Sequence, residues 1–351
     1  MIFGASYGSL LGTKLAMGGH HATLVCLPNE AEIINAEGTV VRLPVRGKAG
    51  PLQVEVRSKD LPGSVTAKTT GDADPADYDL IGLAMQEPQY RSPGVRELLD
   101  ATARSGKPCM SIMNMPPLPY LARLPGLDTS LVRNAFTDPT VWDSFDPANM
   151  TLCSPDPQAF RPPDEPLNVL QVTLPTNFKV ARFVSDEATA MLRGLQADIE
   201  KVRYDVGDGP IDLPVKLKVH ESIFVPLAKW AMLLTGNYRC VTPTGARSIR
   251  DAVYSDLDAS RAVYAWVQDV CVKLGAARED MVPFEKYANA ADGLVRPSSA
   301  ARALYAGAPN IERVDRLVQS IAKSLGMRNQ GVDETVALVD AQLEHNRRKA
   351  A

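Results

Sequence analysis

The chain has 351 residues, of which 45% are hydrophobic and 23% are charged, and its formal net charge is −3. Because a single hydrophobic core usually stops growing at about 250–300 residues, this length predicts two domains. The near-neutral charge without a basic stripe argues against nucleic acid as a partner. No apolar run approaches the ~20 residues of a membrane-spanning helix, so we expect no membrane partner either.

The cysteines and histidines are informative through their spacing. Five cysteines occur singly, without a C-x-x-C pair, and the N-terminus lacks the basic region and cleavage pattern of a signal peptide. This usage is typical of reduced, mostly buried thiols and predicts a cytoplasmic protein. The four histidines, including the adjacent His20 and His21, show no metal-ligand spacing, so we expect no metal site.

The start of the chain indicates a nucleotide site. An apolar strand ending at Phe3 runs through a glycine turn into a helix, and a second strand follows at 24–27. The free N–H groups at such a helix N-terminus, with the helix dipole behind them, bind phosphate or pyrophosphate. The pattern departs from G-x-G-x-x-G, because the small Ser6 replaces the second glycine and Gly8 comes one residue early. An ordinary strand-to-helix turn remains the alternative. The residues that we expect at the pyrophosphate are Gly4, Ala5, Ser6, Tyr7, Gly8 and Ser9.

The segment 1–135 alternates strands and helices. Apolar runs at 24–27, 79–85 and 109–113 are bounded by polar turns, which is typical of parallel strands buried on both faces. A helical stretch at 95–101 lies between the last two. This alternation predicts a doubly wound α/β domain with a parallel sheet.

The character of the chain changes twice after residue 135. Proline and aromatic residues concentrate at 136–180, where we expect irregular strands and ordered loops. An acidic first turn opens a helix at 185–202, and from Val215 onward only helical periodicity is visible. The longest helices are expected near 248–274, 311–325 and 333–345. The predicted domains are a Rossmann-type dinucleotide-binding domain at 1–208, with a proline-rich specificity segment at 136–180, and an all-α substrate and dimerisation domain at 209–351.

Seven motifs follow one another along nearly the whole chain. They are Gly4 with Gly8-Ser9-Leu10-Leu11-Gly12; Asp79-Leu80-Ile81; Ser111-Ile112-Met113-Asn114; Lys216-Leu217-Lys218-Val219 with Pro226-Leu227; Arg296-Pro297-Ser298-Ser299; Asn310-Ile311-Glu312; and Gly331-Val332-Asp333-Glu334-Thr335. In order, spacing and the switch to a helical domain, the chain resembles the ketopantoate reductase (2-dehydropantoate 2-reductase) family. It looks like a divergent member.

The resemblance implies a catalytic lysine. In that family a lysine on the first helix of the second domain is the general acid, which protonates the carbonyl oxygen as hydride arrives from the nicotinamide. Lys216 matches it, or Lys218, because the spacing to Pro226 differs by one. The chemistry asks for a cation, since a ketone that gains hydride becomes an alkoxide. His220, one helical turn after Lys216, is expected on the same face. Solvated lysines in a first helical turn are the alternative.

Three more positions match substrate-binding residues of the family. Asn114, at the carboxyl end of the strand 109–113, matches an asparagine near the nicotinamide and substrate. Glu312 matches the acidic residue that holds the substrate hydroxyl, and Ser298 or Ser299 matches a contact to the substrate carboxylate. A turn-forming asparagine and an exposed helix start are the alternatives for Asn114 and Glu312.

The cofactor-binding positions depart from the family. The second strand ends at Leu27 without the arginine that takes the 2′-phosphate of NADP, and Gln86 replaces a family lysine after the third strand. Because a phosphate without paired cations binds less well, the choice between NADP and NAD stays open. A ribose diol would have only Glu30 or Asn29 to accept its hydrogen bonds. Leu27, Gln86 and Asn114 complete the expected cofactor-binding residues.

Three functions follow from these patterns. The first is an NAD(P)-dependent reductase of a ketone or 2-oxo acid, with a substrate other than ketopantoate. The second is an opine-type dehydrogenase acting on an imine, with His220 as the acid/base residue. The third is a dinucleotide-binding sensor without turnover. The expected partner is a small carbonyl or hydroxy compound, and a homodimer is expected because dimers are the commonest assembly.

Overall fold

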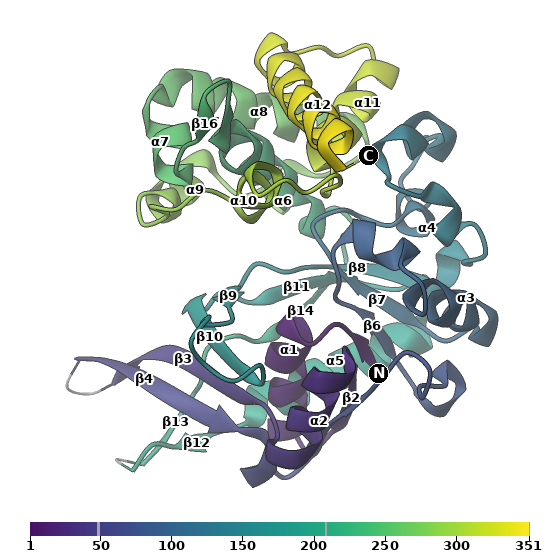
Figure 1. Ribbon diagram of the computed structural model, residues 1–351, viewed down its shortest axis with the longest axis vertical. Helices are drawn as coiled ribbons and strands as arrows, with labels where there is room; N and C mark the ends of the chain where they lie inside the picture. The colour runs from purple at the N-terminus through teal and green to yellow at the C-terminus, as the bar shows by residue number, and fades with distance from the viewer. Residues whose placement is uncertain (48–49, 208, 351) are drawn as a thin grey trace. The chain divides into compact units, whose positions relative to one another are not determined.

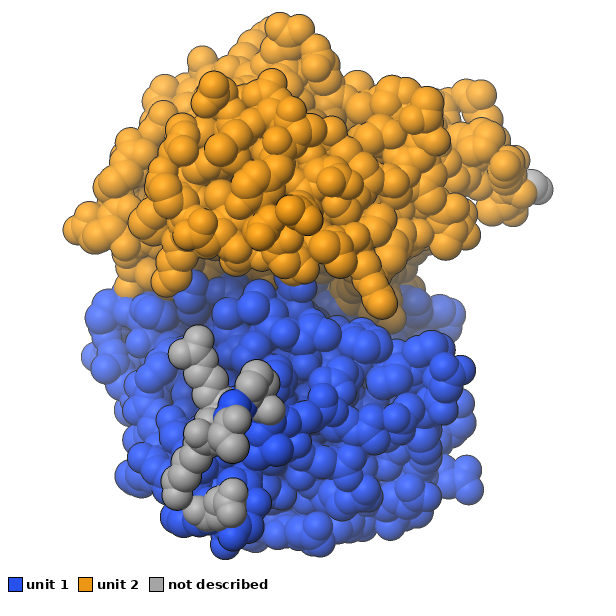
Figure 2. Space-filling view, turned by 90° about the vertical axis from the view of Figure 1, so that its left-hand side faces the viewer, with its two compact units in different colours: residues 1–85, 92–113, 144–221 blue, residues 86–91, 114–143, 222–351 orange. Residues whose placement is uncertain are grey.

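The computed structural model describes residues 1–47, 50–207 and 209–350 (Figure 1). The chain divides into two compact units, which Figure 2 shows in different colours. Unit 1 comprises residues 1–85, 92–113 and 144–221, and unit 2 comprises residues 86–91, 114–143 and 222–351. No helix among the described residues combines the length and the apolar character needed to cross a membrane.

Unit 1 is built on an eight-stranded sheet with the order β14-β11-β8-β7-β6-β1-β2-β5. All neighbouring strands are parallel except β8 and β11. The strands are β1 (Ile2–Phe3), β2 (His21–Val25), β5 (Ser64–Lys68), β6 (Ile81–Leu83), β7 (Cys109–Ile112), β8 (Met150–Ser154), β11 (Phe178–Ala181) and β14 (Leu217–His220). The strand order reverses at β1, as it does in doubly wound sheets, so the predicted Rossmann-type architecture is confirmed.

A smaller sheet with the order β4-β3-β10-β9 completes unit 1. Its strands are β3 (Val40–Gly47), β4 (Gly50–Arg57), β9 (Gln158–Phe160) and β10 (Val169–Leu174). Helix α1 (Ser6–Met17) contacts β1, β2 and β5 of the large sheet and also β3, β9 and β10 of the small one. Packing from both sheets therefore fixes the direction of α1, and with it the position of the glycine turn.

The remaining helices of unit 1 are α2 (Pro28–Glu37), α3 (Val95–Ser105) and α5 (Asp186–Lys201), and α3 and α5 lie where the sequence predicts helices. The strand β12 (Tyr204–Asp205) pairs antiparallel with β13 (Pro210–Ile211). Ser185 caps α5 by accepting a hydrogen bond from the Ala188 N–H at 3.3 Å. Together with the acidic residues of the first turn, this cap explains why the helix begins where the sequence predicts.

The proline-rich segment 136–180 contains strands and connecting loops, as expected, and the pairing of β9 with β10 has an irregular register between Val172 and Leu174. Another expectation is wrong. The chain after Val215 is not only helical, since β14 pairs in parallel with β11 at the edge of the large sheet. Leu-Lys-Val-His alternates apolar and polar residues, which suits a strand, but four residues are too few to distinguish this period from a helical one.

Unit 2 is mostly helical. Its helices are α4 (Leu118–Leu121), α6 (Lys229–Met232), α7 (Ile249–Tyr254), α8 (Leu257–Lys273), α9 (Phe284–Ala291), α10 (Ser299–Tyr305), α11 (Val314–Ser324) and α12 (Gln330–Ala350), and a two-residue hairpin joins β15 (Val241–Thr242) to β16 (Gly245–Ala246). The long helix predicted at 248–274 is divided, because Asp256 caps α8 by accepting a hydrogen bond from the Ala259 N–H at 2.9 Å.

The division into units is discontinuous in the sequence. It falls between Glu221 and Ser222, and two segments that follow β6 and β7 also belong to unit 2. The first of these, 86–91, donates a hydrogen bond from the Glu87 N–H to Glu312 at 3.3 Å. In the second, 114–143, the Tyr120 hydroxyl donates to the Ile223 carbonyl. Such long-range contacts leave no local signal in the sequence.

Candidate active site

The glycine turn has the geometry of an anion-binding helix start. Gly4 has a φ of +89°, and a Cβ at this position would lie 2.9 Å from the Ala84 carbonyl oxygen. A Cβ on Gly8 would lie 3.2 Å from a Leu24 methyl carbon, so this glycine allows α1 to pack closely on the sheet. The first turn of α1 contains no acidic residue, and the N-cap, Ala5, has no side-chain acceptor. The N–H groups of this turn therefore remain available to an anion.

Two side chains of the turn have structural contacts. The Tyr7 hydroxyl donates a hydrogen bond to the Pro157 carbonyl at 2.9 Å, and Ser9 Oγ donates to the carbonyl of the N-cap residue Ala5. An anion here would therefore bind to backbone N–H groups and to the Ser6 hydroxyl rather than to Tyr7 or Ser9.

An arginine lies at the end of β2, although the sequence shows none nearby. Leu27 is the N-cap residue of α2 and donates its N–H to the Glu30 carboxylate at 3.1 Å. Arg161, from the connection between β9 and β10, forms an ion pair with the same carboxylate. The cation absent from the local sequence is thus supplied from 131 residues away.

Lys216 and Lys218 are not on the first helix of the second domain, and this expectation is wrong. Lys218 lies in the edge strand β14, Lys216 directly precedes that strand, and the side chains of both contact α5. Lys216 pairs with Asp212 and donates to the Ile199 carbonyl at 3.4 Å. The Lys218 ammonium pairs with Glu200. Both charges are therefore used within unit 1.

His220 ends β14, so it does not share a helix face with Lys216 as predicted. Its backbone carbonyl accepts a hydrogen bond from the Arg182 N–H at 2.9 Å, which continues the pairing of β14 with the β11 segment. Residues two apart on a strand lie on the same face of the sheet. His220 therefore still shares a face with the lysines, but through the two-residue period of a strand and not through a helical turn.

Several predicted residues meet in a small pocket of unit 2, which we call the Glu312 pocket. It has a volume of about 20 Å³, enough for one water-sized or hydroxyl-sized group. Gln86, Asn114, Glu312 and Ser299 come together there from four separate parts of the chain. The full lining is Gln86, Asn114, Leu233, Asn237, Tyr238, Ser299, Ala300, Ala303, Ile311 and Glu312.

The Glu312 carboxyl is electrostatically unusual. Burial raises its pKa to about 7, and the neighbouring Glu87 carboxylate adds to this rise. Hydrogen bonds from the Glu87 N–H and the Asn114 side chain, together with the Lys229 ammonium, act in the opposite direction. A carboxyl with these surroundings changes its protonation near neutral pH, as groups that transfer or position protons do.

Asn114 provides a second unusual group. Its Oδ1 atom is buried and has no hydrogen-bond partner among the described residues. A buried acceptor without a partner is costly, so this oxygen favours a ligand that brings an N–H or O–H donor.

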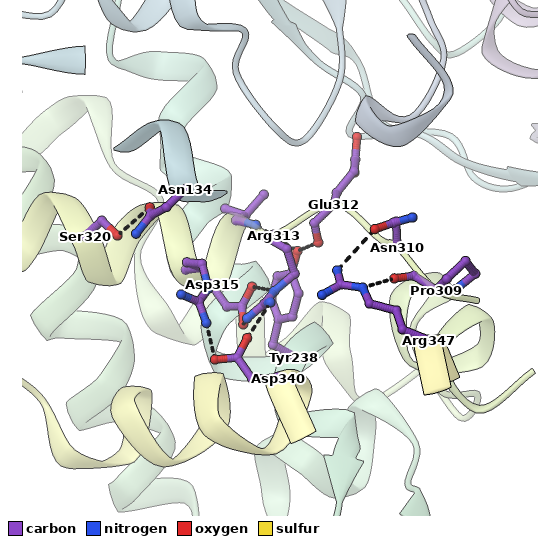
Figure 3. A network of polar contacts seen from close by, with 12 residues as sticks. Asn134, Tyr238, Pro309, Asn310, Glu312, Arg313, Asp315, Ser320, Asp340 and Arg347 are labelled. Atoms are coloured by element: carbon purple, nitrogen blue, oxygen red, sulfur yellow. Dashed lines mark hydrogen bonds and ion pairs between the residues drawn. The ribbon is translucent and has the colours of Figure 1, made fainter. Parts of the chain in front are cut away.

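Two residues of this region were missed by the sequence analysis. Lys229 begins α6, the first α-helix after the division between the units, and lies one helical turn before Leu233 of the pocket lining, where a π-helical segment (Leu233–Asn237) begins. The i, i+4 spacing of Lys229 and Leu233 was the available signal. Tyr238 fixes the backbone around Glu312, because its hydroxyl donates to the Glu312 carbonyl and accepts from the Val314 N–H at 3.0 Å (Figure 3).

The two serine candidates differ in their environments. Ser298 is buried, caps α10 and donates from Oγ to the Asn237 carbonyl at 2.7 Å. Ser299 is exposed and lines the pocket. Of the two, only Ser299 offers its side chain to a ligand without breaking a helix cap.

The fold is that of the two-domain ketopantoate reductases. No family model and no curated protein matches the chain. Among solved structures, a putative ketopantoate reductase from Ralstonia solanacearum MolK2 aligns over 98% of this chain and 97% of its own, with 16% identity and a TM-score of 0.62. A ternary complex of D-mandelate dehydrogenase with NADH and anilino(oxo)acetate aligns over 99% and 100%, with 14% identity and a TM-score of 0.63. A probable 2-dehydropantoate 2-reductase from Bacillus subtilis aligns over 97% and 98%, with 14% identity and a TM-score of 0.61. The resemblance stated from the sequence is therefore confirmed at the level of the fold.

Proposed function

We propose that this chain is a nicotinamide-dependent oxidoreductase that interconverts a 2-oxo acid, or a similar ketone, and its hydroxy form. The observation that carries the proposal is the gathering of Glu312, Asn114 and Lys229 in unit 2. A carboxyl with a pKa of about 7, an acceptor without a partner and an ammonium group suit a carbonyl that becomes a hydroxyl.

Each of the three residues has a distinct role in this reaction. When bound, the nicotinamide supplies or removes a hydride. Lys229 stabilises the negative charge that develops on the carbonyl oxygen and donates the proton to it. Asn114 accepts a hydrogen bond from the substrate through Oδ1. The Glu312 carboxylate accepts from a substrate hydroxyl and so orients the substrate.

The assignment of the general acid to Lys229, rather than to Lys216 or Lys218, rests on its position near Glu312, whose pKa its charge lowers. Lys216 and Lys218 belong to unit 1, where they pair with Asp212 and Glu200. The family resemblance also implies that the general acid lies on the first helix of the second domain. Lys229 begins such a helix, whereas Lys216 and Lys218 do not lie on a helix.

The dinucleotide fits the glycine turn of unit 1. The close approach of Gly4 to Ala84, the tight packing at Gly8 and the open first turn of α1 are the features that a pyrophosphate requires. Gly4, Gln86 and Asn114 follow the carboxyl ends of β1, β6 and β7 by no more than three residues. In open α/β sheets this end of the strands is where ligands bind.

The first experiment is a binding and turnover screen. Purified protein is titrated with NADH and NADPH while tryptophan quenching and nicotinamide fluorescence are followed, and aliphatic and aromatic 2-oxo acids are then added. We expect tight binding of at least one dinucleotide and oxidation of it by one class of 2-oxo acid. If neither dinucleotide binds, the proposed function is wrong. Binding without turnover on any carbonyl would instead favour a dinucleotide sensor.

We further propose that NADH is preferred over NADPH. A 2′-phosphate at the end of β2 would lie beside the Glu30 carboxylate and would compete with it for Arg161, whereas a ribose diol can donate to that carboxylate. We expect Glu30→Gln to improve NADPH binding and Arg161→Ala to weaken NADPH binding. If each variant changes the affinities for NADH and NADPH by the same factor, this assignment is wrong.

A homodimer is the proposed assembly. Dimers are the commonest assembly, and one structural neighbour, a ketopantoate reductase from Staphylococcus aureus at 10% identity and a TM-score of 0.55, is described as dimeric. Light scattering coupled to size exclusion would give twice the 38.0 kDa of the chain. A mass of one chain would contradict it.

A further inference from the structure

Unit 2 contains a second cavity, which we call the arginine pocket. Its volume is about 260 Å³, far more than the Glu312 pocket offers. Ile311 lines both cavities, so they lie on two sides of the segment that joins α10 to α11. The lining residues are Asn134, Ala135, Phe136, Thr137, Asn310, Ile311, Arg313, Arg316, Asp340 and Arg347.

Two of the three arginines in this pocket are neutralised by aspartates. Arg313 donates to Asp315 through Nε and Nη2, both at 2.9 Å, and to Asp340 through Nη1 at 2.6 Å (Figure 3). Arg316 pairs with the other oxygen of Asp340. Two cations and two carboxylates thus form a closed network, which holds one wall of the cavity in place.

Arg347 is the third arginine, and its contacts are different. Its Nε donates to the Pro309 carbonyl at 2.9 Å, and its Nη2 donates to Asn310 Oδ1 at 3.1 Å. Both acceptors are neutral, and no ion pair joins Arg347 to a carboxylate among the described residues. The pocket therefore carries one uncompensated positive charge.

The remaining polar groups of the lining favour the same kind of ligand. Asn310 uses Oδ1 to accept from Arg347, and Asn134 uses Oδ1 to accept from Ser320 Oγ at 3.5 Å. Each side chain therefore has its amide N–H groups left to donate. The Glu312 carboxylate is not part of this surface, because its side chain points away from the arginines (Figure 3).

We propose that the arginine pocket binds a small oxyanion, with a carboxylate or phosphate group held by Arg347 and by the Asn310 and Asn134 amides. Guanidinium groups match the planar oxygen pairs of these anions, and a charge-assisted hydrogen bond is about twice as strong as a neutral one. The volume admits a compact metabolite rather than a dinucleotide. This binding does not depend on the proposed reductase function, since none of its donors belongs to the Glu312 pocket's polar groups.

The test is calorimetric titration of the full-length protein with citrate and, separately, with inorganic phosphate, each against chloride at matched ionic strength. We expect Arg347→Gln to weaken binding by at least about tenfold, as the loss of a charged partner does. Arg348→Gln is the matched control, because Arg348 is the next residue, pairs with Glu344 and does not line the pocket. It should leave the affinity unchanged within about twofold.

The outcomes separate the possible sources of binding. If only citrate binds, and Arg347→Gln weakens its binding, the natural ligand carries a carboxylate. If only phosphate binds in this way, the natural ligand is phosphorylated. Phosphate that binds with the same affinity to the wild type and to Arg347→Gln is held elsewhere, at the glycine turn of unit 1, and this result contradicts a phosphate site in the arginine pocket. If Arg347→Gln lowers the thermal stability, Asn134→Ala provides a second test, with a smaller expected loss. Binding of neither anion, or equal weakening by Arg347→Gln and Arg348→Gln, would overturn the proposal.

Discussion

Three lysines of unit 1 and Lys229 of unit 2 have different electrostatic surroundings. Lys14 and Lys216 are buried, and Lys216, like Lys218, is paired with a carboxylate of its own unit. Lys229 instead acts on Glu312, whose pKa lies near 7. A lysine whose charge is balanced by a structural partner contributes to stability. One that faces a carboxyl poised between two protonation states can take part in chemistry.

The sharpest test of this contrast is Lys229→Met. We expect kcat/KM for the 2-oxo acid substrate to fall by about a thousandfold, because the developing alkoxide loses its proton donor. Lys218→Met is the control and should change kcat/KM by less than about threefold, since its exposed ion pair contributes little. Steady-state kinetics at saturating dinucleotide measures both. A larger loss in the Lys218 variant would reverse the assignment of the general acid.

Glu312→Gln should have the next largest effect. We expect a loss of about thirtyfold in kcat/KM, equivalent to the ~2 kcal/mol of a hydrogen bond to a charged group. Because the pKa of Glu312 is about 7, wild-type activity should rise as the pH passes through about 7 and the carboxylate forms. The pH profile of the glutamine variant should lack this rise. An unchanged profile would exclude Glu312 as its source.

Asp212→Asn tests the structural role of the unit 1 lysines. The amide removes the charge that pairs with Lys216 and Arg203 and that raises the pKa of Lys14, so we expect a loss of about 1 kcal/mol in the free energy of unfolding, limited by the solvent exposure of Asp212. Urea denaturation measures it. Glu200→Gln, which removes the partner of Lys218, should cost no more than about 0.5 kcal/mol. Equal costs would show that burial of the lysines is unimportant.

Lys14 gives unit 1 a contribution to the free energy of unfolding that depends on pH. Burial, and then the charge of Lys216, lower the pKa of Lys14 from 10.5 to about 7, with Asp212 acting in the opposite direction. Between about pH 7 and 10.5 the unfolded state therefore binds more protons, and stability should rise with pH across this window. Lys14→Met should flatten that rise in urea denaturation at pH 7, 8 and 9. A parallel rise in the variant would show that another group is responsible.

Local patterns were sufficient to predict much of unit 1. The glycine turn before α1, the apolar runs of β2, β6 and β7, and the acidic start of α5 each carry their signal within a few residues. The small sheet was not predicted. The strand β14 was assigned to a helix, because a four-residue alternation is ambiguous until its partner β11 is known.

Part of the candidate site follows from the sequence. Asn114, Glu312 and Ser299 were named from the sequence and lie in one pocket, whereas Lys229, which we propose as the general acid, was not named. The difference follows from taking Lys216 and Lys218 as helical, which is wrong. Once β14 is a strand, the first α-helix beyond the division between the units begins at Lys229 instead.

Short-range periodicity and composition are enough to specify the doubly wound domain, the helical C-terminal part and the residue types available for carbonyl chemistry. Which of the charged side chains are already paired follows only from the packing of the folded chain. Arg161 forms an ion pair with Glu30, and Lys216 forms one with Asp212. Asp315 and Asp340 form ion pairs with Arg313 and Arg316. Whether two charged residues pair depends on the distance between them and on their burial, and both of these depend on how the chain packs.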